Sequence, residues 1–219
     1  MAACACPPAE DLIEGGPASL FARNRAWAQA KLQIDPHFFD RLVGQQKPHF
    51  FWIGCSDSRV PATEIVDLVP GEMFVHRNVA NLAIAEDPNF AAALQFAVEV
   101  LKVRHIMVVG HYGCGGIEAA MAEQSDDAVG QWLKPVRKLF HQRRHDIVED
   151  DQPAHRLCEA NVAAQVAALA QNSIVQAAWE RGAALNLHGW IYAIGDGLLR
   201  QVLEPVCWCS DSIRRPEMI

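Results

Sequence analysis

Short apolar runs alternate along the chain with longer stretches of helical periodicity. The short runs, rich in aromatic and β-branched residues, predict strands at 49–54, 73–76, 105–110 and 185–194. The longer stretches predict helices. The clearest of them, 90–101, repeats its apolar residues along one helical face after an Asp-Pro start signal. Strands that alternate with helices predict an α/β fold with a central, mostly parallel sheet flanked by helices.

Caps and chain breakers predict the remaining elements. Further helices are expected at 18–34, around 38–43, and at 61–68, 117–121, 129–141 and 154–171. Ser173 should cap a shorter helix that Gly182 ends, and the polar stretch 145–153 should form a loop. A glycine-rich turn at 195–197 predicts an edge strand or hairpin arm at 198–203. Residues 1–17, with three prolines and two glycines, are expected to form a flexible arm, and residues 18–219 a single domain.

Composition limits the classes of partner. The chain has 219 residues, of which 51% are hydrophobic, and this apolar surplus favours burial against another subunit. A net charge of −7 argues against nucleic acid, and no apolar run approaches the ~18 residues of a membrane span. The amino-terminal residues lack the charged start and apolar core of a signal peptide, so a cytoplasmic location with reduced cysteines is the default expectation.

The seven cysteines do not resemble a disulfide framework. Cys158 lies on the apolar stripe of a predicted helix and is expected to be an inert core thiol. Four others lie near the chain ends, where they would bind a metal, form disulfides or be incidental. The incidental interpretation is favoured because no partner pair stands at ligand spacing beside them. These four are Cys4, Cys6, Cys207 and Cys209.

The other two cysteines and a histidine follow predicted strands. Cys55 ends the run at 49–54, and His111 and Cys114 follow the run at 105–110. In an α/β sheet, ligands bind beyond the carboxyl ends of the strands. Two thiolates and an imidazole favour zinc, and a fourth, open position is typical of catalytic zinc. The alternative is that both cysteines are core thiols and the histidine is a satisfied loop residue.

Asp57 and Arg59 follow Cys55 at alternate positions. Asp57 has two possible partners: it either fills the fourth zinc position or pairs with Arg59 and accepts a hydrogen bond from zinc-bound water. Zinc with two thiolates and a neutral histidine has no net charge, so it acidifies its water less than a three-histidine site does. Such a site should need an oriented acceptor or mildly alkaline pH. A loop salt bridge without a chemical role is the alternative for this pair.

These motifs resemble those of the β-class carbonic anhydrases over residues 18–203. The resemblance rests on four motifs, which occupy three separate segments in the family's order: Cys-x-Asp-x-Arg at 55–59, the segment 76–81, and Gly-His-Tyr-Gly-Cys-Gly-Gly at 110–116 with its embedded His-x-x-Cys-Gly. It implies reversible hydration of CO2 to bicarbonate and a proton by zinc-bound hydroxide. It also implies one Zn2+ per chain, held by the three residues above, with Asp57–Arg59 as the catalytic pair.

The resemblance also implies a substrate pocket and an assembly. Gln46 matches a glutamine that donates to substrate. Phe74, Val79, Phe96 and Gly115 match the pocket for CO2, which is partly contributed across a dimer interface. Phe96 departs from the tyrosine common at its position, so a hydrogen bond there is in doubt. The family implies a homodimer, often a dimer of dimers, in which an amino-terminal helical arm packs on the partner.

One subgroup of the family is gated by bicarbonate at a second, noncatalytic site. Its markers match Trp52, Gly54, Arg77 and Tyr192. In that subgroup Asp57 would move onto zinc in the inactive state, which makes a two-state switch biased by an anion. The alternative is that the two aromatic residues belong to the core and that Arg77 forms an interface ion pair.

Other functions fit less well. A zinc deaminase needs His-x-Glu with a later Pro-Cys-x-x-Cys, and neither occurs. A redox role for the Cys-Trp-Cys at 207–209 lacks the Cys-x-x-Cys spacing. A protein that senses zinc or bicarbonate without turnover stays open as the alternative to the enzyme, although the Asp57–Arg59 pair and Gln46 argue against it.

Overall fold

The structure, a computed structural model, describes residues 16–122 and 125–208, and the chain divides into two compact units between Gln45 and Gln46. The first unit holds helix α1 (Gly16–Ile34), which begins within the predicted arm. Residues 36–44 form consecutive turns rather than the predicted helix. Their hydrogen bonds switch between three- and four-residue spacing, as in Leu42 N to Phe39 O and Val43 N to Phe39 O, so no continuous helical ladder forms.

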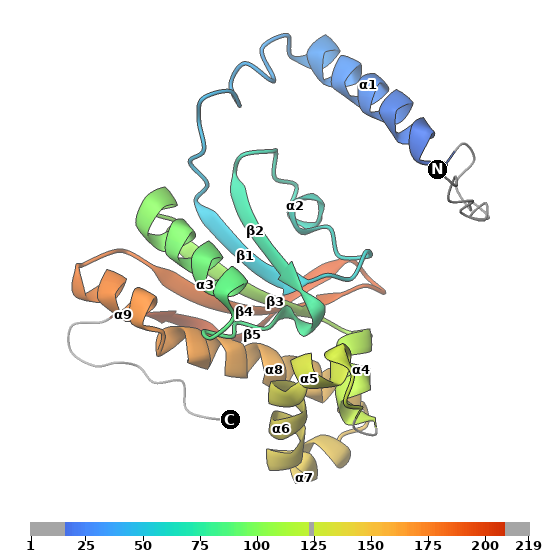
Figure 1. The fold of residues 1–219 in the computed structure, drawn as a ribbon, viewed down its shortest axis with the longest axis vertical. Helices are drawn as coiled ribbons and strands as arrows, with labels where there is room; N and C mark the ends of the chain where they lie inside the picture. The colour runs from blue at the N-terminus through green and yellow to red at the C-terminus, as the bar shows by residue number, and fades with distance from the viewer. Residues whose placement is uncertain (1–15, 123–124, 209–219) are drawn as a thin grey trace, which may run out of the picture. The chain divides into compact units, whose positions relative to one another are not determined.

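The second unit is built on a five-stranded sheet in the order β2-β1-β3-β4-β5 (Figure 1). The first four strands are parallel, and β5 is an antiparallel edge strand, which confirms the predicted fold class. The strands are β1 (Phe50–Cys55), β2 (Met73–Asn78), β3 (His105–His111), β4 (Asn186–Ala193) and β5 (Leu198–Cys207). β5 extends four residues beyond the predicted arm.

The connections between strands are mostly helical. They comprise α2 (Ala62–Ile65), η1 (Val79–Asn81), α3 (Pro88–Gln95), the π-helical turn η2 (Phe96–Leu101), α4 (Gly115–Met121), α5 (Ala128–Trp132), α6 (Lys134–Gln142), α7 (Arg144–Val148), α8 (Pro153–Ala170) and α9 (Ser173–Glu180). The helix predicted over 90–101 therefore changes from α to π geometry at Phe96, and the helix predicted over 61–68 ends at Ile65.

Three local predictions are wrong for identifiable reasons. The helix expected at 129–141 breaks at Leu133 into α5 and α6, because Pro135 has no N–H to continue the ladder. Part of the expected loop at 145–153 forms α7, which buries Ile147. The cap of α9 is Asn172 rather than Ser173, since its side chain accepts the Ile174 N–H at 2.9 Å.

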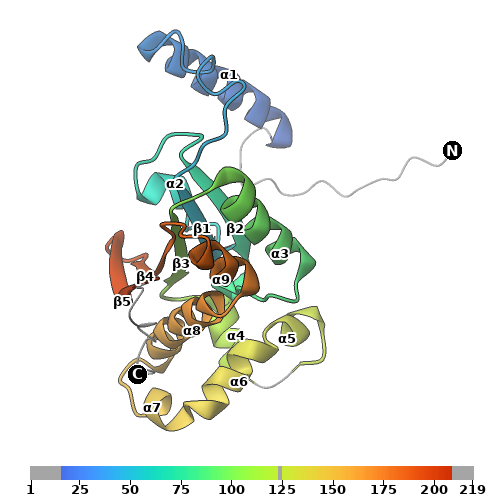
Figure 2. The same cartoon turned by 90° about the vertical axis from the view of Figure 1, so that its left-hand side faces the viewer.

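The two faces of the sheet bury separate clusters of apolar side chains. The larger cluster includes Ile53 and packs under α3, α8 and α9, which lie on the same side of the sheet (Figure 2). The smaller cluster, around Trp52, lies on the other face with α2. Cys158 is buried in the larger cluster, as predicted, and Cys207 is the exposed last residue of β5. Cys4, Cys6 and Cys209 fall outside the described residues.

The strand order of the sheet reverses between β1 and β3. From β1 the chain passes to β2 on one side, and the later β3 pairs on the other side. The carboxyl ends of β1 and β3 are therefore neighbours at the point where the strand order reverses, which is where open α/β sheets bind ligands. Among the helices of the described residues, none is long and apolar enough to cross a bilayer.

Candidate metal centre

Three metal-ligating side chains meet where the strand order reverses. Cys55 is the last residue of β1, His111 is the last of β3, and Cys114 precedes α4. All three residues are buried, and their ligand atoms lie within 4.8 Å of one another. The two sulfur atoms are 3.8 Å apart. The parallel pairing of β1 with β3 thus brings together residues that are 56 to 59 positions apart in sequence.

The tautomer of His111 suits a metal ligand. Its Nδ1 lies 3.1 Å from the carbonyl oxygen of Tyr112, which only accepts, so Nδ1 carries the proton. The lone pair of the neutral ring is then on Nε2, which is buried without a hydrogen-bond partner among the described residues. An orphaned buried nitrogen costs free energy, and a metal ion at this place would remove that cost.

The two thiols also suit a cation between them. The hydrogen bond from Cys114 lowers the pKa of Cys55, and the same contact raises the pKa of Cys114, because two adjacent buried thiolates repel each other. The backbone N–H groups of Asp57 and Ala80 also lower the pKa of Cys55. A zinc ion would stabilise both thiolates at once, so the three residues fit the metal that their chemistry predicts.

Asp57 is paired with Arg59 in this structure. Asp57 Oδ1 accepts the Arg59 backbone N–H at 2.9 Å and Nε–H at 3.0 Å, and Oδ2 accepts from Nη2 at 2.7 Å. These bonds hold the pKa of the carboxyl well below its usual range. Arg59 also donates to Gly113 O at 3.2 Å, which ties the loop after β1 to the loop after β3. Asp57 Oδ2 lies 3.8 Å from His111 Nε2, so this oxygen faces the metal position.

A sequence model described as carbonic anhydrase matches residues 50–199 of the chain. The chain belongs to the β-carbonic anhydrase family. A carbonic anhydrase of Emericella nidulans is 40% identical over 186 residues, which are 84% of this chain and 82% of that protein. Members of the family are zinc lyases, and the group formed by Cys55, His111 and Cys114 is suited to one such ion.

Solved β-carbonic anhydrases have the same fold. The Coccomyxa enzyme, solved with acetazolamide, superposes with a TM-score of 0.85 at 34% identity, covering 89% of each chain. One of two tetrameric β-carbonic anhydrases from Sordaria macrospora superposes with a TM-score of 0.82 at 35% identity, covering 87% of this chain and 98% of the other. The single α/β domain with a mostly parallel sheet is therefore shared along most of the chain.

The residues expected to line the substrate pocket of this carbonic anhydrase separate into two groups. Val79 follows Asn78, which pairs with Cys55, and Gly115 follows Cys114, so both belong to the end of the sheet that carries the ligands. Phe74 and Phe96 stack with ring centroids 5.9 Å apart, but Phe74 pairs with Phe51, four residues before Cys55. At ~3.3 Å per residue, this position is about 13 Å along the strand from the metal ligand.

Gln46 belongs to the second of these groups. It is exposed and precedes β1, so it lies toward the amino end of the strand whose carboxyl end carries Cys55. Within one chain the structure therefore brings together the metal ligands, the Asp57–Arg59 pair, Val79 and Gly115. It does not bring Gln46, Phe74 or Phe96 to the same edge of the sheet.

The four residues expected to bind bicarbonate face the opposite side of the sheet from the thiols. Trp52 is buried in the smaller cluster, against which Tyr192 packs. Gly54 has no room for a side chain, because a Cβ there would stand 2.2 Å from the Trp52 indole nitrogen. Arg77 pairs with Gly54 in register, and it donates to the carbonyl oxygens of Cys55 at 2.8 Å and Asp57 at 2.5 Å.

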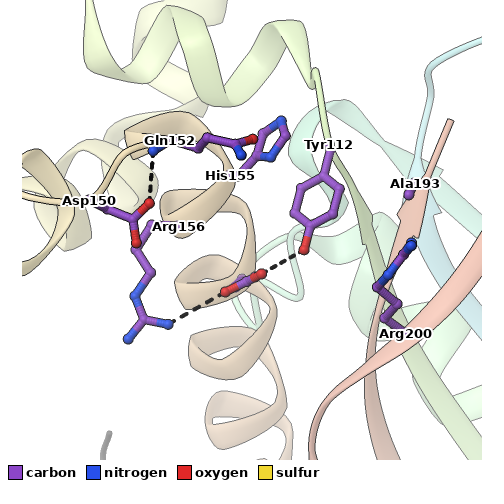
Figure 3. A pocket seen from close by; sticks show the side chains of 8 residues that line it. Tyr112, Asp150, Gln152, His155, Arg156, Ala193 and Arg200 are labelled. Carbon is purple, nitrogen blue, oxygen red and sulfur yellow. Dashed lines mark hydrogen bonds and ion pairs between the residues drawn. The ribbon is translucent and has the colours of Figure 1, made fainter. Parts of the chain in front are cut away.

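One contact that the sequence did not predict connects the loop after His111 to helix α8. Tyr112 extends toward α8, where its hydroxyl donates to Glu159 at 2.6 Å and its ring stacks on His155 with centroids 4.1 Å apart (Figure 3). Burial, followed by the bond to Glu159, raises the pKa of Tyr112 to about 12. A polar hollow of about 450 Å³ opens beside these residues, and Arg156 and Arg200 also line it. No spacing in the sequence signals this contact between β3 and α8.

Proposed function

We propose that the protein hydrates CO2 reversibly to bicarbonate and a proton, with Cys55, His111 and Cys114 as the zinc ligands. The observation that carries the proposal is the convergence of two buried thiols and an unpartnered imidazole nitrogen beside an ionised, arginine-held carboxylate. Zinc, when bound, supplies the Lewis acidity that makes water nucleophilic near neutral pH. A non-catalytic sensor of zinc or bicarbonate would not need the carboxylate in this position.

Asp57 would act as the oriented acceptor. Arg59 occupies Oδ1 with two donors and binds one side of Oδ2, so the remaining lone pair of Oδ2 is the one that faces the reacting water. Because the pKa of Asp57 is held low, the carboxylate accepts a hydrogen bond throughout the neutral and alkaline range. This acceptor fixes the direction of the nucleophile beside a zinc–ligand group without net charge.

We propose further that the working unit is at least a homodimer. Gln46, Phe74 and Phe96 lie toward the amino end of the strands, so a second copy would supply them to the zinc site of the first. None of the described residues of α1 is buried, which leaves its apolar side chains for a partner. The tetrameric state described for the Sordaria enzymes supports assembly into a dimer of dimers. The cytoplasmic location stays a prediction.

Bicarbonate regulation at a second site is also proposed, because Arg77 connects that site to Asp57. Its guanidinium donates to the backbone on both sides of Ser56, so an anion that draws Arg77 away would loosen the segment that carries Asp57. Bicarbonate should therefore inhibit the native enzyme at neutral pH, and Arg77→Ala should relieve this inhibition in an intact dimer. Unchanged inhibition in that variant would count against the second site.

The catalytic proposal is tested by Asp57→Asn, which keeps the shape of the side chain but removes its charge. Asp196 offers a matched control, because it accepts the N–H two residues ahead and pairs with Arg200 in the same way, on an exposed turn. In stopped-flow CO2 hydration, Asp57→Asn should lose on the order of 10²-fold or more in kcat, whereas Asp196→Asn should stay near wild type. Near-normal turnover of zinc-loaded Asp57→Asn would overturn the assigned role.

A further inference from the structure

The imidazole of His111 takes its direction from a backbone carbonyl. Its Nδ1–H donates to Tyr112 O at 3.1 Å, which leaves the Nε2 lone pair for the metal. A histidine ligand depends on such a partner, because the partner fixes both the tautomer and the orientation of the ring. The acceptor here is the peptide oxygen of the next residue. The orientation of the ring therefore depends on how firmly Tyr112 is held.

Gly113, the residue after this carbonyl, does little to hold it. Gly113 has a φ of 66°, in the left-handed region that glycine enters freely. A Cβ at this position would meet no atom within 4 Å, so packing does not confine the peptide on that side. Arg59 Nη2 donates to Gly113 O at 3.2 Å, but the arginine side chain is 56% exposed. The firmer restraint on the carbonyl comes from Tyr112 itself.

Tyr112 is held at its amide and at its side chain. Its backbone N–H donates to Tyr192 O in β4 at 3.1 Å. Its hydroxyl donates to Glu159 Oε1 in α8 at 2.6 Å, and its ring stacks on His155 with centroids 4.1 Å apart (Figure 3). When the nitrogen and the Cβ of a tetrahedral Cα are both fixed, the direction of the carbonyl carbon is fixed as well.

The bond to Glu159 is the strongest of these restraints. A hydroxyl that donates to a carboxylate at this distance forms a charge-assisted bond, roughly twice as strong as one between neutral groups. Glu159 lies in the second turn of α8, between the buried residues Leu157 and Ala160, so the core of the domain fixes its backbone. Its other oxygen lies 3.4 Å from Arg156 Nη1, a long and partly exposed contact that contributes little.

We propose that Tyr112 and Glu159 are positioning residues for the zinc ligand His111. The hydrogen bond between them holds the Tyr112 carbonyl in place, and that carbonyl holds the imidazole with Nε2 toward the metal. Both side chains act through the backbone of Tyr112 and not on the reacting atoms. The inference rests on the proposed zinc centre but not on CO2 turnover, because metal binding can be measured in an inactive protein.

The competing account is that this bond only joins the loop after β3 to α8 and stabilises the fold. Its loss would then lower the melting temperature without changing how the ligands hold the metal. The two accounts differ in the visible spectrum of protein that carries Co2+ in place of zinc, because the d–d bands of Co2+ report the geometry of its ligands. They also differ in the rate at which the protein releases zinc.

The experiment compares variants of the full-length protein loaded with Zn2+ or Co2+. Tyr112→Phe removes the hydroxyl and keeps the stacked ring, and Glu159→Leu removes the acceptor. Both should release zinc to excess chelator about 10-fold faster than wild type, the lower end of the range for lost ligand partners, because the carbonyl itself remains. Both should also change the cobalt spectrum. Glu159→Gln keeps an acceptor oxygen, so it should restore both readouts most of the way to wild type.

Gln165→Met and Arg156→Gln are the controls. Gln165 also lies in α8, where it accepts the Ala83 N–H at 2.9 Å and donates to Asn161, which in turn donates to Ala80 O. That loop, after β2, carries none of the three ligands. Gln165→Met should therefore lower the melting temperature but keep zinc release within about twofold of wild type and the cobalt spectrum unchanged. Arg156→Gln removes only the long contact and should match wild type in every readout.

Two results would overturn the proposal. One is wild-type zinc release with an unchanged cobalt spectrum in both Tyr112→Phe and Glu159→Leu. The other is an equal effect of Gln165→Met, which would mean that any loosening around α8 releases zinc. If Glu159→Leu does not fold, Tyr112→Phe decides between these outcomes. A protein that shows the expected differences among its variants but does not hydrate CO2 would contradict the proposed function and support this inference.

Discussion

Helices α1 and α8 have nearly the same length, 19 and 18 residues, but opposite surroundings. α8 buries eight residues, and its neighbours include β3 and β4. None of the 19 described residues of α1 is buried. At least 41% of each of its large apolar side chains is exposed, namely Leu20, Phe21, Trp27, Leu32 and Ile34.

The comparison shows that apolar residues in a helix can serve either the core of their own chain or a contact with another chain. In α8 they pack against the sheet of the same chain, and interspersed polar residues reach the loops around the metal site. In α1 they remain exposed, although Trp27 packs edge-on against the rings of Phe38 and Phe39. An exposed apolar surface of this kind marks an interaction site. On this account α8 maintains the zinc centre from within one chain, while α1 serves an assembly that brings the distant pocket residues to it.

The largest expected effect follows removal of α1. A chain that starts at Gln46 keeps all three zinc ligands and the whole sheet, so it should bind about one zinc but behave as a monomer. CO2 hydration should fall on the order of 100-fold, because Phe74 and Phe96 of the same chain lie far from the zinc and misplaced groups lose roughly this much rate. Zinc analysis measures the metal content, light scattering measures the oligomeric state, and stopped-flow rates measure the loss of activity. A fully active monomer would contradict the claim that α1 serves an assembly which the zinc site needs.

A matched pair of leucine truncations should give a smaller effect. Leu157 in α8 is fully buried, so Leu157→Ala should lower the free energy of unfolding by about 2–5 kcal/mol. Leu32 in α1 is 41% exposed in the single chain, so Leu32→Ala should instead raise the dimer dissociation constant and leave the unfolding of dilute monomer within about 0.5 kcal/mol of wild type. Denaturant melts at low and high protein concentration separate these outcomes. Equal, concentration-independent losses would show that α1 packs within its own chain.

The metal ligands could be placed from the sequence because parallel strands align their carboxyl ends. Cys55 and His111 each end an apolar run, and that rule alone brings them to one edge. Trp52 and Gly54 are two residues apart in a strand, where side chains alternate between faces, so both could be placed on the same face of β1. The hydrophobic pattern alone does not give the order of the strands or their register. In the structure, the register shows that Phe74 lies about 13 Å along the sheet from Cys55 of the same chain.

Other features depend on contacts that leave no periodic signal. Asn161 and Gln165 stand four residues apart within an apolar helix, a spacing that indicates a shared face but not the loop they hold. Pro135 breaks the helix predicted over 129–141 at Leu133, although the helical periodicity of the sequence continues across this point. Residues 145–153 are mostly polar and were predicted to form a loop, but the burial of Ile147 stabilises helix α7 there.

The central claim, a zinc-dependent carbonic anhydrase, is tested most directly by stopped-flow CO2 hydration across pH on zinc-loaded, chelator-stripped and reloaded protein. With about one zinc per chain the rate should rise toward alkaline pH, because the zinc–dithiolate group without net charge acidifies water only weakly. Stripping should abolish the rate, and stoichiometric zinc should restore it. A zinc-loaded, dimeric protein that fails to hydrate CO2 at alkaline pH would contradict the account.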